Sequence, residues 1–401
     1  MSVLLLLAAL YTDTAHVAGV AVQGEVLWAA TSGGVEQYDL RLGTRTRVFT
    51  TEDGLDANEV LRVWSEGASL RARTARSECR LETQGRFLCT PAAPLPPAEP
   101  AVAPLHHRAR ETARIRADGR EIVATDGAGL WLDGRRITPD GQLCGNHVEA
   151  LASLRGALWV GTFDRGICVL ERGQFRSVPV PFRMVNDLAA TPEGLWVAAG
   201  EGLYFSPEGH RFLRETRVRE RGANRIAVTR RWVFVTTPAA LYAIRRDKAA
   251  IVRRWRRPAG STALQAVAVS GRDVWLASED AGVIRMRGEK FQVFDRASGL
   301  PSSWIVDVAP ARGGGVWVAT LRDGMLRLGP DGSVRERGRD SRAWGLRVYV
   351  DDGSVLFGTQ QGIEGWTAPL PDPRVHALLR TSDGLWVGTE GGLLLADMAK
   401  L

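Results

Sequence analysis

Few residues in this sequence have the types and spacing that chemistry usually needs. Acidic residues stand beside glycine in the turn-like stretches "SPEGH", "TPDGQ", "GPDGS" and "DDGS", but none has the acidic spacing of a calcium loop. The neighbouring His106 and His107 are typical of an exposed loop, and motifs for a nucleophilic serine, a phosphate loop or a zinc protease are absent. We therefore expect no cofactor, no metal site and no enzymatic activity. The alternative is a lyase or hydrolase whose site is dispersed over separate parts of the chain.

The four cysteines suggest two disulfides. Cys79 and Cys89 flank "RLETQGRFL", a predicted hairpin in which they would face each other. Cys144 and Cys168 form the second candidate pair, in neighbouring repeats. Each disulfide would stabilise an exported protein by roughly 2–4 kcal/mol. The alternative is four reduced, partly buried thiols.

One pattern recurs along the whole chain. It appears as "LWAATSGGVEQYD" from Leu27, "LWVGTFDRGICVL" from Leu158, "VWVATLRDGMLRL" from Val316 and "LWVGTEGGLLLAD" from Leu385, with further and weaker copies between them. We call the aligned aromatic site of each copy the Trp position. Its occupants are Trp28, Arg71, Ile122, Trp159, Trp196, Phe234, Trp275, Trp317, Leu356 and Trp386. They lie 30 to 51 residues apart, and a four-stranded propeller blade needs about 40.

Each repeat contains short apolar or alternating runs separated by turn residues, and none has a helical period. We therefore predict an all-β fold, a single β-propeller of about nine or ten four-stranded blades over residues 11–401. The recurrent Trp would pack between blades, and the Thr three residues later would satisfy backbone groups at the strand end. A Pro-rich stretch at about 90–105 predicts a loop insertion.

The repeats resemble those of the two-component regulator propeller family. The resemblance rests on "LWVGT" followed by a glycine-containing turn, and on the loops "FTTEDGLDANEVLRV" from Phe49 and "FDRASGLPSSWIVDV" from Phe294. In that family the propeller is usually the extracytoplasmic sensing part of a membrane histidine kinase. This chain contains no internal membrane span and no kinase region. The resemblance therefore implies a propeller that binds something outside the cytoplasm.

The N-terminal apolar run Val3–Leu10 is too short to span a membrane. It suits the core of a signal peptide at residues 1–10, although it could instead supply the strand that closes the propeller. The first interpretation predicts a periplasmic or secreted protein, and the second leaves a cytoplasmic location open. The formal net charge is +7, but the arginines are scattered among acidic residues, so we expect no nucleic-acid partner.

Residues thirteen positions before the Trp position should lie where the chain enters each inner strand, around one rim of the central channel. Allowing one extra residue in one repeat, the polar ones are Asn58, Asn146, Arg183, Arg221, Thr262 and Ser303. Gathered at one opening, they could bind a small molecule or oligosaccharide, and Arg183 with Arg221 could hold a carboxylate or sulfate. Capping of exposed strand starts explains the same residues without a ligand.

The leading functional hypothesis is a noncatalytic, sensor-like propeller that binds a ligand outside the cytoplasm. The alternatives are a scaffold for a protein partner, which would use the Pro-rich loop and the rim, and the dispersed-site lyase or hydrolase.

Overall fold

The computed structural model describes residues 9–93, 110–246, 252–258, 261–339, 342–351 and 353–396. Within these ranges the chain forms ten antiparallel sheets and two short 3-10 turns, η1 (Thr51–Asp53) and η2 (Arg296–Ser298). This confirms the predicted all-β fold with about ten blade-like sheets. The arrangement of the ten sheets differs from the prediction.

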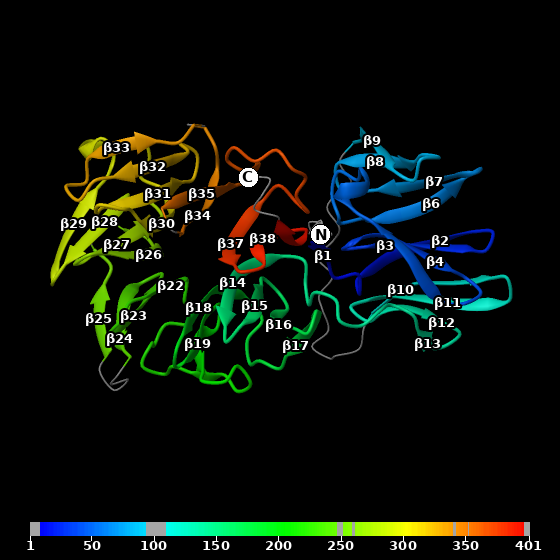
Figure 1. Cartoon of the computed structure of the whole chain (residues 1–401), viewed down its shortest axis with the longest axis horizontal. Coiled ribbons are helices and arrows are strands. Elements are labelled where there is room, and N and C mark those ends of the chain that lie inside the picture. Colours follow the sequence, from blue (N-terminus) through cyan, green and yellow to red (C-terminus); the bar gives the residue numbers. More distant parts are fainter. Residues whose placement is uncertain are drawn as a thin grey trace, which may run out of the picture.

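Seven of the sheets form a closed ring, coloured green to red in Figure 1. The inner strands contact one another in the order β14, β18, β22, β26, β30, β34 and β37, and β37 contacts β14 again. The ring strands are β14 (Val148–Leu154), β15 (Ala157–Thr162), β16 (Gly166–Glu171), β17 (Gln174–Val178), β18 (Val185–Thr191), β19 (Gly194–Ala199), β20 (Gly202–Ser206), β21 (Leu213–Arg214), β22 (Arg225–Val228), β23 (Trp232–Thr237), β24 (Ala240–Arg245), β25 (Val252–Arg256), β26 (Leu264–Ser270), β27 (Asp273–Ser278), β28 (Val283–Arg287), β29 (Lys290–Phe294), β30 (Ile305–Pro310), β31 (Val316–Thr320), β32 (Met325–Leu328), β33 (Val334–Arg337), β34 (Gly345–Asp351), β35 (Ser354–Thr359), β36 (Gly362–Ile363), β37 (Val375–Thr381), β38 (Gly384–Thr389) and β39 (Gly392–Ala396).

A strand from the start of the chain completes the last sheet of the ring. β1 (Ala9–Tyr11) pairs antiparallel with β39 as the outer strand. Gly392 has a φ of 138°, and a Cβ there would lie 2.7 Å from the carbonyl oxygen of Tyr11, so this contact requires glycine. Of the predicted segment Val3–Leu10, the structure places Ala9 and Leu10 in a strand, while residues 1–8 lie outside the described residues.

The other three sheets form an open arc, blue to cyan in Figure 1. The sheet β2–β5 lies in the middle, with β6–β9 on one side and β10–β13 on the other. The arc strands are β2 (Val17–Gln23), β3 (Val26–Thr31), β4 (Gly34–Asp39), β5 (Thr44–Phe49), β6 (Arg62–Glu66), β7 (Ser69–Arg73), β8 (Ser77–Leu81), β9 (Phe87–Pro91), β10 (Arg110–Ala117), β11 (Arg120–Asp126), β12 (Gly129–Leu132) and β13 (Arg135–Arg136).

The side chain at the Trp position explains where the arc ends. In the ring this side chain packs on the following sheet, as Trp159 packs with Val185 and Leu195. In the arc, Trp28 packs on β6–β9 and Ile122 packs on β2–β5. The Trp position of β6–β9 is Arg71, whose guanidinium pairs with Glu66 and Glu78, so that face is charged and no sheet covers it.

The opposite end of the arc is charged as well. On the outer face of β10–β13, Arg114 pairs with Glu111 and Glu121. With charge on both outer faces, neither end favours burial against another sheet. The expectation of one ring of nine or ten blades is therefore corrected to a closed ring of seven sheets and an arc of three.

Two further predictions of detail are corrected. The sheet β34–β36 has three strands, because the segment that follows it, "EGWTAPLPDP" from Glu364, contains three prolines that cannot complete a ladder. The predicted loop at about 90–105 begins later than expected, since Thr90 and Pro91 still belong to the outer strand β9. Residues 94–105 lie outside the described residues.

The recurring Trp and Thr of the repeats have the structural roles that the sequence predicted. Trp275 and Trp386 are among the largest fully buried side chains. The Thr three residues after the Trp position donates its hydroxyl to a backbone carbonyl across the turn, as Thr31 does to Gly34 and Thr389 does to Gly392. This bond satisfies a carbonyl at the strand end and fixes the turn.

Candidate functional site

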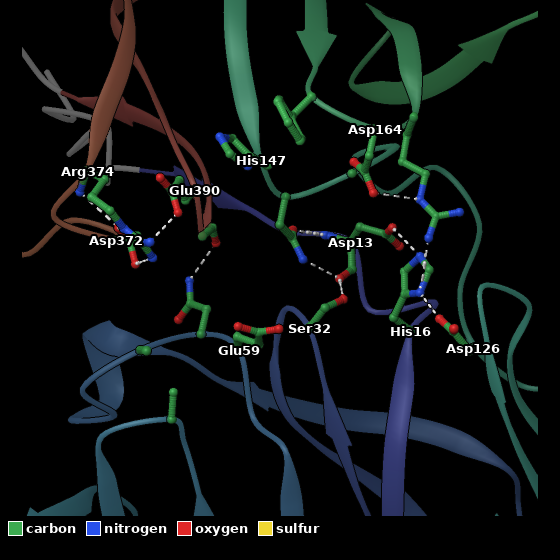
Figure 2. A pocket seen from close by; sticks show the side chains of 18 of the residues that line it. Asp13, His16, Ser32, Glu59, Asp126, His147, Asp164, Asp372, Arg374 and Glu390 are labelled. Atoms are coloured by element: carbon green, nitrogen blue, oxygen red, sulfur yellow. Dashed lines mark hydrogen bonds and ion pairs between the residues drawn. The ribbon is translucent and has the colours of Figure 1, made fainter. Parts of the chain in front are cut away.

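A polar cavity of about 710 Å³ lies between the ring and the arc. Figure 2 shows its labelled side chains, with Asp13 and His16 beside Asp126 on one side and Asp372, Arg374 and Glu390 on the other. The lining comprises Asp13, His16, Ser32, Ala57, Asn58, Glu59, Ala75, Arg76, Asp126, Gly145, Asn146, His147, Phe163, Asp164, Arg165, Asp372, Arg374, Glu390 and Gly391. Both bodies of the molecule therefore contribute walls to one cavity.

Polar bonds across the cavity hold the arc against the ring. Asn146, just before β14, accepts from the backbone N–H of Asp13 at 2.6 Å and donates to its carbonyl at 2.8 Å. Asn58, in the arc, donates to the carbonyl of Gly391 at 3.0 Å. Asp13 lies in the segment that leads from β1 in the ring to β2 in the arc, so Asn146 fixes this connection, while Asn58 bonds the arc directly to the ring.

Charged side chains in the wall are largely paired with one another. Arg374 donates to both carboxylate oxygens of Asp372, at 2.8 and 2.9 Å, and forms an ion pair with Glu390. Burial alone would raise the pKa of Asp372, but the hydrogen bonds from Arg374 outweigh it and lower that pKa. At the other wall, burial raises the pKa of Asp13. These groups form a preorganised polar surface.

An aromatic side chain stands exposed among these polar groups. Phe163 follows β15, is 42% exposed, and stacks on the imidazole of His147 with ring centroids 4.9 Å apart. The backbone N–H of Phe163 donates to the carbonyl of His147, which fixes the loop. The ring therefore offers a flat apolar platform inside a polar cavity.

His147 also belongs to a cluster of imidazoles and carboxylates. Its Nε2 lies 2.9 Å from Oε1 of Glu149, and Nδ1 of His376 lies 3.5 Å from the same oxygen. Burial opposes the charged form of His147, but Glu149 and the nearby carboxylates outweigh burial and raise its pKa. Burial likewise opposes ionisation of Glu149, but the close contact with His147 and the charges of His147 and His376 outweigh burial and lower the pKa of Glu149.

The central channel of the ring carries a second charged group. A cavity of about 300 Å³ contains Arg225, Arg347, Asp187 and Asp307. Arg347 lies 3.3 Å from Asp187 and 3.7 Å from Asp307. Burial opposes the charged guanidinium, but the two aspartates outweigh it and raise the pKa of Arg347. Two cations and two anions balance here, so the channel has little net charge to attract an ion.

The structure divides the predicted rim residues between the two bodies: Asn58 precedes β6 of the arc, and the other five precede inner strands of the ring. Asn58 and Asn146 line the cavity. The other four precede the inner strands β18, β22, β26 and β30 of the ring, and none of them lines this cavity: Arg183, Arg221, Thr262 and Ser303. Ser303 instead lines a separate pocket with Trp304 and Arg322. The prediction assumed a single ring, and Asn58 belongs to the arc.

The structure joins the cysteines in the pairs that the sequence suggested. Cys79 is bonded to Cys89 and Cys144 to Cys168. In the hairpin β8–β9, Cys79 lies opposite Cys89 and Leu81 opposite Phe87. Each bond links segments that are already neighbours.

Sequence reasoning missed Phe163, His147, His376 and Glu390. Phe163 and Glu390 occupy the same place in two repeats, directly after "LWVGT". A comparison of that place across the repeats would have singled both out, because it carries different residue types from copy to copy. That they share one cavity depends on the packing of the arc against the ring, which no local pattern contains.

The ring and arc of antiparallel sheets define the chain as a β-propeller protein. Residues 369–391 match the family described as "Two component regulator propeller", which confirms the resemblance predicted from the repeats. No curated protein matches the chain in sequence. In the described residues, no helix has the length and apolar character needed to cross a membrane.

Solved structures share this fold at low sequence identity. The extracellular domain of the putative hybrid two component system BT4673 from B. thetaiotaomicron is 14% identical, with a TM-score of 0.52, over 95% of this chain and 70% of that one. The corresponding domain of BT3049 is 15% identical, with a TM-score of 0.53, over 96% and 56%. Virginiamycin B lyase from Staphylococcus aureus is 13% identical, with a TM-score of 0.53, over 62% and 94%. At these identities the likeness shows the fold alone.

Proposed function

We propose that this protein is a noncatalytic, sensor-like propeller that binds an oligosaccharide outside the cytoplasm, in the cavity between the ring and the arc. The observation that carries the proposal is the exposed ring of Phe163 inside a cavity whose other lining residues are mostly polar or charged. A sugar presents an apolar ring face that stacks on an aromatic side chain, and hydroxyls that both donate and accept hydrogen bonds.

The charge of the cavity favours a neutral sugar over an anionic one. Six carboxylates line it (Asp13, Glu59, Asp126, Asp164, Asp372 and Glu390) against three arginines (Arg76, Arg165 and Arg374), so the formal charge is 3 − 6 = −3 with the imidazoles neutral. An anion would be repelled by this excess. The anionic ligand considered for Arg183 and Arg221 would have to bind elsewhere.

The position of the cavity supports a sensing role. A ligand that contacts both walls stabilises the arrangement in which the arc lies against the ring, and this shifts the population toward it. Binding between the ring and the arc can therefore change how the arc is positioned relative to the ring. The comparison proteins include extracellular domains of two-component systems.

The disulfides of the chain support a location outside the cytoplasm. The two disulfides are typical of an oxidising compartment. Free cysteines are absent from the described residues. We therefore assign the protein to the periplasm or the extracellular space.

The test begins with a screen of the full-length protein against neutral and acidic oligosaccharides, followed by calorimetric titration of the sugar that binds. We expect Phe163→Ala to weaken binding at least about twofold and up to about tenfold, since loss of one aromatic contact costs roughly 0.5–1.5 kcal/mol beyond area burial. The matched control is Trp304→Ala. Trp304 is an aromatic residue that is 45% exposed on the same rim of the ring, but it lines another pocket. That variant should bind like the wild type.

Two results would contradict the proposal. Equal affinity of the Phe163→Ala and wild-type proteins for the sugar would show that the sugar does not bind in this cavity. Release of cleaved or unsaturated products during prolonged incubation with the bound sugar would show an enzyme, and the noncatalytic assignment would then be wrong.

A further inference from the structure

The cluster of His147, Glu149 and His376 has the composition of a metal site. The structure brings one donor atom from each residue within 4.8 Å of the other two. Glu149 lies in β14 and His376 in β37, on the inner strands of the first and last sheets of the ring, which are neighbours. Residues 229 positions apart in the chain, 376 − 147, are thus joined by closure of the ring.

The side chains of Glu149 and His376 leave the backbone at equivalent irregularities of their strands. The register of β14 against β15 shifts between Val148 and Ala150, and that of β37 against β38 shifts between Val375 and Ala377. Glu149 and His376 are therefore the extra residues of two equivalent β-bulges. The same shift recurs in β2, β18, β30 and β34, so the bulge belongs to the repeat and redirects one side chain of each of these inner strands.

Distances within the cluster suit a shared ion better than direct bonding. Nε2 of His147 is buried and 2.9 Å from Glu149, yet it makes no hydrogen bond, so the oxygen lies off its bonding direction. Ligand atoms about 2.0–2.2 Å from one metal ion lie roughly 2.9–3.5 Å from each other in octahedral or tetrahedral geometry. The measured separations of 2.9 and 3.5 Å fall in that range.

A second layer of contacts orients His376 as a metal ligand. Its other nitrogen, Nε2, lies at hydrogen-bond distance, 3.0 Å, from Oε1 of Glu390, and Arg374 holds Glu390 in turn. A carboxylate that accepts from the far nitrogen fixes the tautomer, leaving Nδ1 free to bind an ion. Glu149, Asp372 and Glu390 against Arg374 give a local formal charge of 1 − 3 = −2, which complements a dication.

From this arrangement we propose that His147 Nε2, His376 Nδ1 and a carboxylate oxygen of Glu149 form a site for one divalent transition-metal ion of the zinc class. Two imidazoles and one carboxylate favour such ions over magnesium or calcium, which prefer oxygen alone. His147 and Glu390 also line the large cavity, so the proposed site lies beside it. The site holds its ion whether or not a sugar is bound, so the proposal stands apart from the proposed function.

The proposal is tested on the full-length protein, stripped with a chelator and without a histidine tag. Titration with Zn²⁺ should give one ion per chain. His147→Ala and His376→Ala should each weaken binding at least about 100-fold, and Glu390→Gln about 10–100-fold through loss of the supporting hydrogen bond. The matched control His210→Ala removes an exposed histidine outside the cluster and should bind Zn²⁺ like the wild type.

A second measurement does not depend on the variants folding. X-ray absorption of the zinc-loaded wild-type protein should show two imidazole ligands in the first shell. Absence of stoichiometric binding, a first shell without imidazole, or unchanged affinity in folded His147→Ala and His376→Ala would overturn the site. The cluster would then be held together by a proton on His147.

Discussion

The pair Asp273–Arg287 shows how single residues of this chain stabilise a blade. Arg287 at the end of β28 donates through Nε and Nη2 to the two carboxylate oxygens of Asp273, each at 2.6 Å. These hydrogen bonds lower the pKa of Asp273. The Arg287 side chain is 62% exposed, so solvent screens the pair and limits its contribution to stability.

The stabilisation should depend on pH in a defined direction. A carboxylate whose pKa is lower when folded stabilises the protein above its unfolded pKa, and this stabilisation is lost as the pH falls through the folded value. Arg287→Gln should therefore lower the free energy of unfolding at about pH 7 and have almost no effect at about pH 2, measured by urea denaturation. The control Arg176→Gln removes a pair with a 3.5 Å contact to a carboxylate that is 48% exposed, and it should change little at either pH. Equal losses at both pH values for Arg287→Gln would show that the ion pair is not the cause.

At the scale of elements, the Trp position decides which sheets can pack together. Trp159 is 4% exposed and lies in the core between β14–β17 and β18–β21. Arg71 in the corresponding place marks a sheet with a free face. The strands and their number were predictable because period and turn residues are local properties. The order of sheets in the arc was not, although Arg71 was a visible signal that no sheet follows β6–β9.

Replacing one tryptophan between two sheets and one on an uncovered face tests how much the packing between sheets stabilises the fold. We expect Trp159→Ala to lower the free energy of unfolding by roughly 3–5 kcal/mol, because it leaves a cavity between two sheets. The matched control is Trp64→Ala. Trp64 pairs with Arg71 on the charged outer face of the arc, so its loss should cost no more than about 1 kcal/mol. Similar losses for both variants in urea denaturation would contradict the packing rule.

The candidate site belongs to the scale of the whole molecule. Its walls come from the loops after β1, β15 and β38, from those before β14 and β37, and from the arc, so no single repeat contains it. Sequence spacing located Asn58 and Asn146 at the correct ends of their strands. It could not join His147 to His376, because their contact arises only when the last sheet of the ring meets the first.

The central claim is that an oligosaccharide binds between the ring and the arc and couples them. Hydrogen exchange of the full-length protein with and without the saturating sugar tests this most directly. We expect slower exchange at the same time in residues 57–59 of the arc and 163–165 of the ring, which face the cavity from opposite bodies. Residues 225–229 in the central channel should be unchanged. Slowing confined to one body, or centred on the channel, would contradict the account.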